Sequence, residues 1–272
     1  MSALKVVCLV AVVGCAAEPP APSTLLISDY RANAIFRYDG VTGEFLGTFA
    51  HGSEQRVDRP AGVRLGPDDQ LYTAGFGRGE VVRYDLHSGR MMDVFYWDTT
   101  LLEEPVELVF EGDELVVLGN DTANLVVLGP DGSVARTFGY PLIRGAHDFV
   151  IDRGRVLVAT EPAIQIWDLA SGTQVGELGR GDLVLATSIA TRGDTIYVAD
   201  WERDQIVTFP DGRVLVDGLR DPISIDIFDG ELYVLDATGM QRFDAETGDH
   251  LSQLVARDDR LLWPRAFTFV RE

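Results

Sequence analysis

Short apolar segments recur at nearly regular intervals along the chain from residue 25 onward. Their starts lie 46, 44, 41, 40 and 36 residues apart, and they occupy 25–29, 71–75, 115–119, 156–160, 196–200 and 232–236. A second apolar strand begins about ten residues before each segment except the first, and a third strand follows each one. Helical spacing is nowhere sustained over the window that a helix needs. The pattern therefore predicts an all-β chain built from a repeated unit.

Tight turns follow the third strand of each unit. Four of them share Asp, two further residues, Ser or Thr, and then Gly, as in 39–43 and 244–248, and the other two contain Pro-Asp-Gly at 130–132 and 210–212. Glycine supplies the positive φ that a tight hairpin requires, and the Asp side chain accepts the free amides of the turn. Four short antiparallel strands in a unit of roughly 40 residues are typical of a β-propeller blade.

Six units are present, but the first lacks its opening strand. A matching apolar strand, 266–270, follows Pro264 at the other end of the chain. We expect this strand to pair into the first blade, because closure removes the exposed edges of an open array. The sequence thus predicts one six-bladed β-propeller of four-stranded antiparallel blades over residues 25–272.

The N-terminal region has the features of a bacterial lipoprotein signal. Lys5 precedes an uncharged apolar run that is too short to span a bilayer, and the run ends in Val-Val-Gly before Cys15. We expect a signal peptide at 1–14, a lipidated Cys15 and a proline-rich tether at 15–24. The alternative is an ordinary secretory signal cleaved near Ala16 or Ala17. Ala16 after the cysteine favours the outer membrane of the cell envelope, on its periplasmic or its surface side.

Composition limits the classes of partner. The chain is 46% hydrophobic and 24% charged, with a formal net charge of -20 at pH 7. No basic stripe is visible, so nucleic acid is not an expected partner. Two cysteines and four histidines leave little material for a zinc site or a disulfide framework. We expect a monomer that contacts the membrane through acylated Cys15.

The repeats resemble those of a known group of propellers. Residues 196–200 followed by Gln205, Ile206 and Val207 resemble an NHL-type repeat, and the whole domain resembles the six-bladed group that includes NHL, SMP-30/gluconolactonase and strictosidine-synthase-like propellers. It does not resemble WD40 proteins, because their Gly-His and Trp-Asp pairs do not recur. The motif marks a fold, and a fold does not determine function.

Resemblance to the gluconolactonases implies a divalent metal, such as Ca²⁺, held at the central channel by Glu, Asp and Asn. The positions that correspond to the Asp and Asn ligands contain neither residue type; they are Ala61, Val106, His147, Thr187, Ile223 and Arg265. The closing strand also supplies no Glu. We therefore predict no cofactor at these positions.

The next residue along each first strand is an acid in two neighbouring blades. These acids are Glu107 and Asp148, and His147 directly precedes the second. These three residues are candidates for a rearranged metal or acid–base site, with Glu107 and Asp148 as its metal ligands. Asp29, Asp200 and Asp236 at second-strand ends could assist them, or could simply cap loops by accepting backbone N–H bonds. No Ser-His-Asp or Cys-His arrangement can be placed.

The longer and less regular loops join second to third and fourth to first strands, and propeller topology puts them on one face. Aromatic and arginine side chains gather there, as recognition surfaces require: Tyr30, Arg31, Phe76, Arg78, Trp97, Arg144, Trp201, Arg203 and Trp263. Their alternative role is to fill gaps between blades. The sequence favours a membrane-anchored binding or scaffold module for a protein, peptide or glycan; the alternative function is a metal-dependent hydrolase or lactonase.

Overall fold

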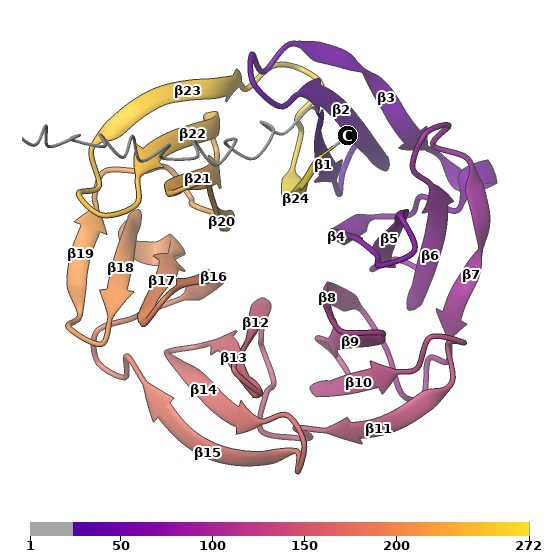
Figure 1. The fold of residues 1–272 in the computed structure, drawn as a ribbon, viewed down its shortest axis with the longest axis horizontal. Helices are drawn as coiled ribbons and strands as arrows, with labels where there is room; N and C mark the ends of the chain where they lie inside the picture. Colours follow the sequence, from indigo (N-terminus) through magenta and orange to yellow (C-terminus); the bar gives the residue numbers. More distant parts are fainter. Residues whose placement is uncertain (1–23, 272) are drawn as a thin grey trace, which may run out of the picture.

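The structure is a computed structural model that describes residues 24–271, and its strands form six four-stranded antiparallel sheets arranged as a ring (Figure 1). The two helical segments are single 3₁₀ turns, η1 (Ser53–Gln55) and η2 (Trp201–Arg203). The predicted six-bladed, all-β fold is confirmed. No helix in this part of the chain is long and apolar enough to cross a bilayer. The predicted signal peptide, Cys15 and nearly all of the tether lie outside the described residues.

Each blade is a meander whose first strand lies nearest the ring axis (Figure 1). The strands of the first three blades are β24 (Pro264–Val270), β1 (Thr24–Asp29), β2 (Ala34–Asp39) and β3 (Phe45–His51); β4 (Pro60–Leu65), β5 (Gln70–Gly75), β6 (Glu80–Asp85) and β7 (Met91–Trp97); β8 (Pro105–Glu111), β9 (Glu114–Gly119), β10 (Asn124–Leu128) and β11 (Val134–Phe138). Those of the last three are β12 (Asp148–Asp152), β13 (Arg155–Thr160), β14 (Ala163–Asp168) and β15 (Thr173–Leu178); β16 (Ala186–Arg192), β17 (Thr195–Asp200), β18 (Gln205–Phe209) and β19 (Arg213–Val216); β20 (Ser224–Phe228), β21 (Glu231–Asp236), β22 (Gly239–Asp244) and β23 (His250–Ala256).

The two ends of the described chain meet in blade 1. Strand β24 pairs antiparallel with β1, with Thr24 opposite Val270 and Ile27 opposite Phe267. The predicted closing strand therefore completes the first sheet, and the register shifts only near Ser28 and Asp29. Because this pairing joins the last strand of the described chain to its first, the ring closes. Blades 1 and 6 therefore leave no exposed sheet face between them.

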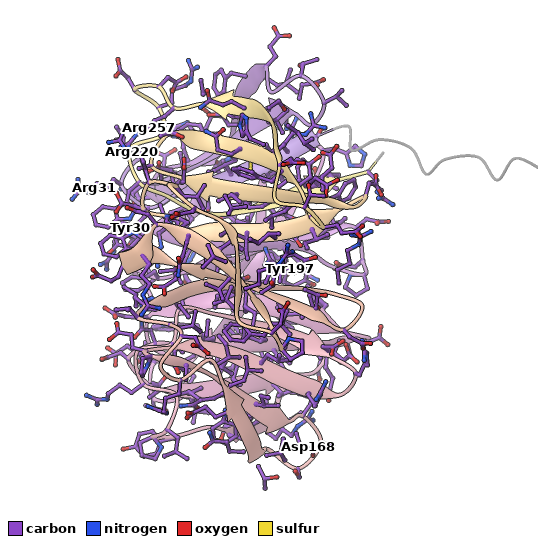
Figure 2. All side chains as sticks on the ribbon, turned by 90° about the vertical axis from the view of Figure 1, so that its left-hand side faces the viewer. Tyr30, Arg31, Asp168, Tyr197, Arg220 and Arg257 are labelled. Carbon is purple, nitrogen blue, oxygen red and sulfur yellow. The ribbon has the colours of Figure 1, made fainter. Side chains whose placement is uncertain are left out.

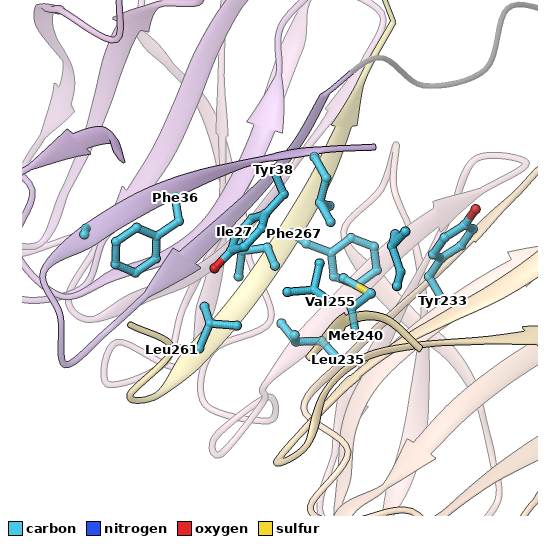
Figure 3. Packing of buried hydrophobic residues seen from close by; sticks show 12 residues of the cluster. Ile27, Phe36, Tyr38, Tyr233, Leu235, Met240, Val255, Leu261 and Phe267 are labelled. Carbon is cyan, nitrogen blue, oxygen red and sulfur yellow. The ribbon is translucent and has the colours of Figure 1, made fainter. Parts of the chain in front are cut away.

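The hydrophobic core lies between blades. Six clusters of buried apolar side chains occupy the six interfaces between neighbouring sheets. Figure 3 shows the cluster between blades 1 and 6, where Tyr38 and Phe267 pack with Leu235 and Met240. Burial of both faces explains why the inner strands have nearly continuous apolar runs instead of strict alternation.

The Asp-x-x-Ser/Thr-Gly turns have the geometry that their sequence predicts. In the first, the Asp39 carboxylate accepts the backbone N–H groups of Val41 and Thr42 at 3.0 and 2.7 Å. Gly43 has a φ of 73°, and a Cβ added there would lie 1.7 Å from the carbonyl oxygen of Leu254 in blade 6. Glycine is thus required both by the turn and by the approach of the next blade.

The two faces of the ring differ in their loops. One face, here called the irregular-loop face, is made by the loops that follow second and fourth strands and includes Tyr30, Arg31, Arg220 and Arg257 (Figure 2). The opposite, hairpin face is made by the remaining turns and includes Asp168. Strand β1 ends at Asp29, next to the irregular-loop face, so it begins at the hairpin face.

Replacement of Phe267 by Ala tests how much the closing strand contributes. The side chain is 1% exposed in the cluster between blades 1 and 6, so we expect F267A to reduce the free energy of unfolding by about 3–5 kcal/mol. Denaturant unfolding measures the change. Leu251→Ala, at a side chain that is 48% exposed on β23, is the control and should cost no more than about 0.5 kcal/mol. Equal losses in the two variants would contradict a special role for the closing strand.

Candidate functional site: a cavity on the irregular-loop face

A cavity of about 400 Å³ lies near the ring axis at the irregular-loop face. Blades 1, 3, 4, 5 and 6 contribute to its wall. Six of the side chains that the sequence singled out line this cavity: Arg31, Glu107, His147, Asp148, Trp201 and Trp263. The fold therefore brings the predicted acidic column and part of the predicted binding face to one place, although blades far apart in sequence supply them.

Asp148 is buried and bonded to the neighbouring blade. Its Oδ1 accepts the backbone N–H of Phe149 at 2.7 Å, and its Oδ2 accepts the Ser188 hydroxyl at 2.5 Å and the N–H of Ile189 at 3.0 Å. The Ser188 oxygen in turn accepts the N–H of Ile225 in blade 6 at 3.0 Å. Burial raises the pKa of Asp148 to about 6, although these donors and Arg64 oppose the rise. The carboxyl group thus links blades 4, 5 and 6.

Glu107 is buried one blade away and faces an arginine. Its Oε1 accepts the N–H of Leu108 at 2.9 Å and lies 3.4 Å from Nη2 of Arg64, whose Nη1 donates to the carbonyls of Val63 and Phe267. Burial raises the pKa of Glu107 to about 7; Arg64 opposes this rise and the Asp148 carboxylate adds to it. Gly62 makes room for Glu107, because a Cβ at Gly62 would lie 2.8 Å from Oε1.

His147 and Arg265 lie at the same position of the first strands in blades 4 and 1, on opposite sides of the ring. Burial and the positive charge of Arg265 lower the pKa of His147. Its Nε2 lies 3.8 Å from the Glu161 carboxylate, beyond hydrogen-bond distance. Between residues 24 and 271, the structure groups no three His, Cys, Asp or Glu side chains as a metal site requires.

The three acids at second-strand ends cap loops. Asp29 accepts the N–H groups of Arg31, Ala32 and Trp263 at 2.8–3.0 Å. The carboxylates of Asp200 and Asp236 likewise accept backbone N–H groups from the loops beside them. All three are buried, so these bonds replace the water that the carboxylates lose on folding.

Part of the predicted binding face packs as an aromatic–arginine cluster. The rings of Tyr30 and Phe76 meet edge to face with centroids 5.4 Å apart, and the guanidinium of Arg59 lies 5.7 and 5.3 Å from them. Arg31 stacks over Trp263 at 4.4 Å from the ring centroid. Tyr30 and Phe76 thus join blades 1 and 2, whereas Trp263, which is 42% exposed, also reaches the cavity.

The remaining predicted face residues do not line the cavity. Arg78 lies 3.7 Å from the Asp58 carboxylate, and Arg203 contacts the Asp200 carboxylate at 3.6 Å and the carbonyl of Asp182. These two arginines therefore also hold loops in place.

Two further members of the set are exposed. Trp97 ends the outer strand β7 with 66% of its surface exposed, and Arg144 is exposed in the loop before β12.

Sequence reasoning missed three arginines near the cavity as site residues. Arg257 and Arg265 line it, and Arg64 approaches Glu107 at its edge. For Arg265 a signal was present, because it occupies the same register position as His147. Arg64 lies two residues beyond Gly62, which holds the same position in blade 2 as Glu107 does in blade 3. Side chains two residues apart lie on the same face of a strand.

Comparisons with known proteins support the fold. No protein-family model matches the chain, and no curated protein matches it. Among the solved structures 1222 chains match. One is a chain of the crystal structure of a nidogen/laminin complex, with a TM-score of 0.76 and 16% sequence identity over 90% of this chain and 97% of that chain. This similarity shows a shared propeller fold, and at this identity it shows the fold alone.

The raised pKa of Glu107 predicts a pH dependence of stability. The folded protein holds this proton up to about pH 7, whereas the unfolded chain loses it near its ordinary value of 4.5, so stability falls as pH rises through 7. His147 and Asp148 titrate mainly below pH 6.5. We therefore expect Glu107→Gln to flatten the fall in stability between pH 6.5 and 8. At pH 8 we expect it to be more stable than the wild type by at least about 1 kcal/mol.

Thermal melting at several pH values measures this difference. Asp39→Asn is the control, because backbone N–H groups lower the pKa of Asp39 and its titration lies far below this window. That variant should show the wild-type slope between pH 6.5 and 8. A wild-type slope in Glu107→Gln would show that Glu107 does not titrate between pH 6.5 and 8 and would contradict the prediction.

Proposed function

We propose that the chain is a membrane-anchored, extracytoplasmic binding module whose irregular-loop face holds a partner protein. The observation that carries this proposal is the cavity of about 400 Å³ on that face, with Trp201, Trp263 and Arg31 in its wall. Exposed aromatic and arginine side chains around a concave centre are the features that contribute most to protein recognition. A peptide or a glycan bound at the same face is the alternative occupant.

The position of the N-terminal end supports this orientation. Strand β1 begins with Thr24 at the hairpin face, so a tether at 15–24 starts opposite the cavity. Ten residues span at most about 35 Å when extended. Lipidation of Cys15 therefore anchors the hairpin face toward the membrane and directs the irregular-loop face away from it.

The known propellers fit this proposal. The matching chain of the nidogen/laminin structure belongs to a protein complex, so a propeller of this fold occurs within such an assembly. We also assign the chain to the broad NHL and SMP-30-like group, on its repeat motif at 196–200 and its closing strand. In this chain the metal-ligand column of the gluconolactonases contains other residues, which favours binding over their chemistry.

Partner capture tests the binding face. We expect Arg31→Ala combined with Trp201→Ala to reduce recovery of a crosslinked envelope protein at least tenfold, because both side chains leave the cavity wall. Arg90→Ala combined with Leu251→Ala is the matched control; both residues are exposed and neither lines the cavity. Quantitative mass spectrometry of the captured proteins measures recovery. Identical partner lists from the two double variants would refute the proposal.

Lipidation is tested separately. We expect wild-type protein to incorporate labelled palmitate and to sediment with the outer membrane, and Cys15→Ser to do neither, because Cys15 is the only cysteine after the signal. Cys8→Ser is the control and should behave as the wild type. A label that persists in Cys15→Ser would contradict this anchor.

A further inference from the structure

Arginines in this acidic chain are mostly neutralised, but those in the cavity wall are not. Most of the chain's arginines form ion pairs with carboxylates. Within residues 24–271, none of the three that line the cavity, Arg31, Arg257 and Arg265, does so. With a net charge of -20, carboxylates are plentiful, yet the cavity wall brings these three arginines together without a carboxylate partner in the described chain.

Arg265 is the clearest case. Its side chain is half-buried, and it makes no hydrogen bond to any residue that the structure describes. Burial disfavours its charged form, which lowers its pKa, and Tyr30 and Glu107 only partly offset this effect. A partly buried guanidinium whose donors are all free costs folding free energy, and a bound anion recovers it.

Other groups around Arg265 complete a set of donors and acceptors. Ser224 lines the same cavity, and its hydroxyl makes no hydrogen bond within the described chain. Asp221 stands at the rim with an exposed carboxylate, while its backbone N–H donates to Asp204. The deeper acids are already engaged, because Asp148 accepts three hydrogen bonds and Glu107 faces Arg64.

We propose that this cavity binds the C-terminal carboxylate of an extended peptide segment of the partner protein, held by Arg265 and Ser224. This inference rests on the proposed binding function. Asp221 accepts a backbone N–H of the segment, and Trp201 and Trp263 contact its last side chain. Capture of a terminal carboxylate by grouped donors is an established mode of peptide recognition.

The shape and chemistry of the cavity favour a chain end over an internal acidic residue. A terminus enters as one strand, whereas an internal residue brings two chain segments into a cavity whose wall includes Arg31, Trp263 and Trp201. The volume of about 400 Å³ is at the small end of the range for ligand sites, and it suits a few residues better than a folded surface. A peptide end also supplies both an acceptor for Arg265 and an N–H donor for Asp221.

Synthetic peptides with free C-termini test the proposal. An array of pentapeptides, each present as the free acid and as the C-terminal amide, is probed with labelled residues 24–272. We expect a set of free acids to bind and their amides to bind at least about 30-fold more weakly, since the amide cannot neutralise Arg265. Arg265→Gln should remove this preference, Arg265→Lys should retain part of it, and Arg90→Gln should leave it unchanged.

His147 provides a second, spectroscopic readout. The charge of Arg265 lowers the pKa of His147, and Glu161 is the nearest carboxylate to its ring. A carboxylate bound to Arg265 offsets that charge, so saturating free-acid peptide should raise the pKa of His147 in an NMR titration. The amide should not. The chain has only four histidines, so the signal can be assigned by the His147→Gln variant.

Four outcomes would overturn the inference. Equal binding of acids and amides would refute carboxylate recognition, as would an unshifted pKa of His147 at saturation. Arg265-dependent binding of glucuronate or acetate without binding of any peptide would show that the cavity takes a small acid. Partner capture that persists in Arg265→Gln but fails in Arg31→Ala with Trp201→Ala would refute this inference while sustaining the proposed function.

Discussion

The antiparallel pairing of β24 with β1 is the contact on which both the fold and the cavity depend. It inserts Phe267 into the core between blades 1 and 6. The same short segment brings Trp263 and Arg265 into the cavity wall. Residues more than 230 positions from β1 therefore form the site only after the ring closes, as the 2.8 Å bond from the Trp263 N–H to the Asp29 carboxylate illustrates. Stability and recognition are linked through one strand.

Polar side chains of the inner strands connect the blades where apolar packing ends. The Ser28 hydroxyl donates to the carbonyl of Ala61 in the next blade at 2.6 Å, and Asp148 and Ser188 connect blades 4, 5 and 6. These bonds satisfy buried polar groups where neighbouring blades meet. Asp148, which by its sequence position is a candidate for chemistry, thus has a structural role in the ring.

Charge is distributed unevenly over the molecule. The chain has a large excess of acids, yet three arginines of its cavity wall form no ion pair within the described chain, and the two deeper carboxylates, Asp148 and Glu107, are already engaged. An excess of acids disfavours the approach of acidic partners, so an anion that binds in the cavity depends on the arginines there. Together with the tether proposed at the opposite face, this arrangement supports the proposed binding site, directed outward and selective for the end of a chain.

Local sequence determined the strands and the turns, and the missing opening strand of the first unit indicated the closure of the ring. The apolar segments, the Asp-x-x-Ser/Thr-Gly turns and the strand at 266–270 were each readable, because strand period and glycine φ depend on neighbouring residues alone. Through the register of the first strands the sequence also identified Glu107, His147 and Asp148, which line the cavity. It could not separate Tyr30 and Phe76, which pack around Arg59, from Trp263, which reaches the cavity. Nor could it show that Arg64 faces Glu107 in the next blade, or that the Arg265 side chain has no hydrogen-bond partner among residues 24–271. Both depend on distances between blades that only the tertiary structure decides.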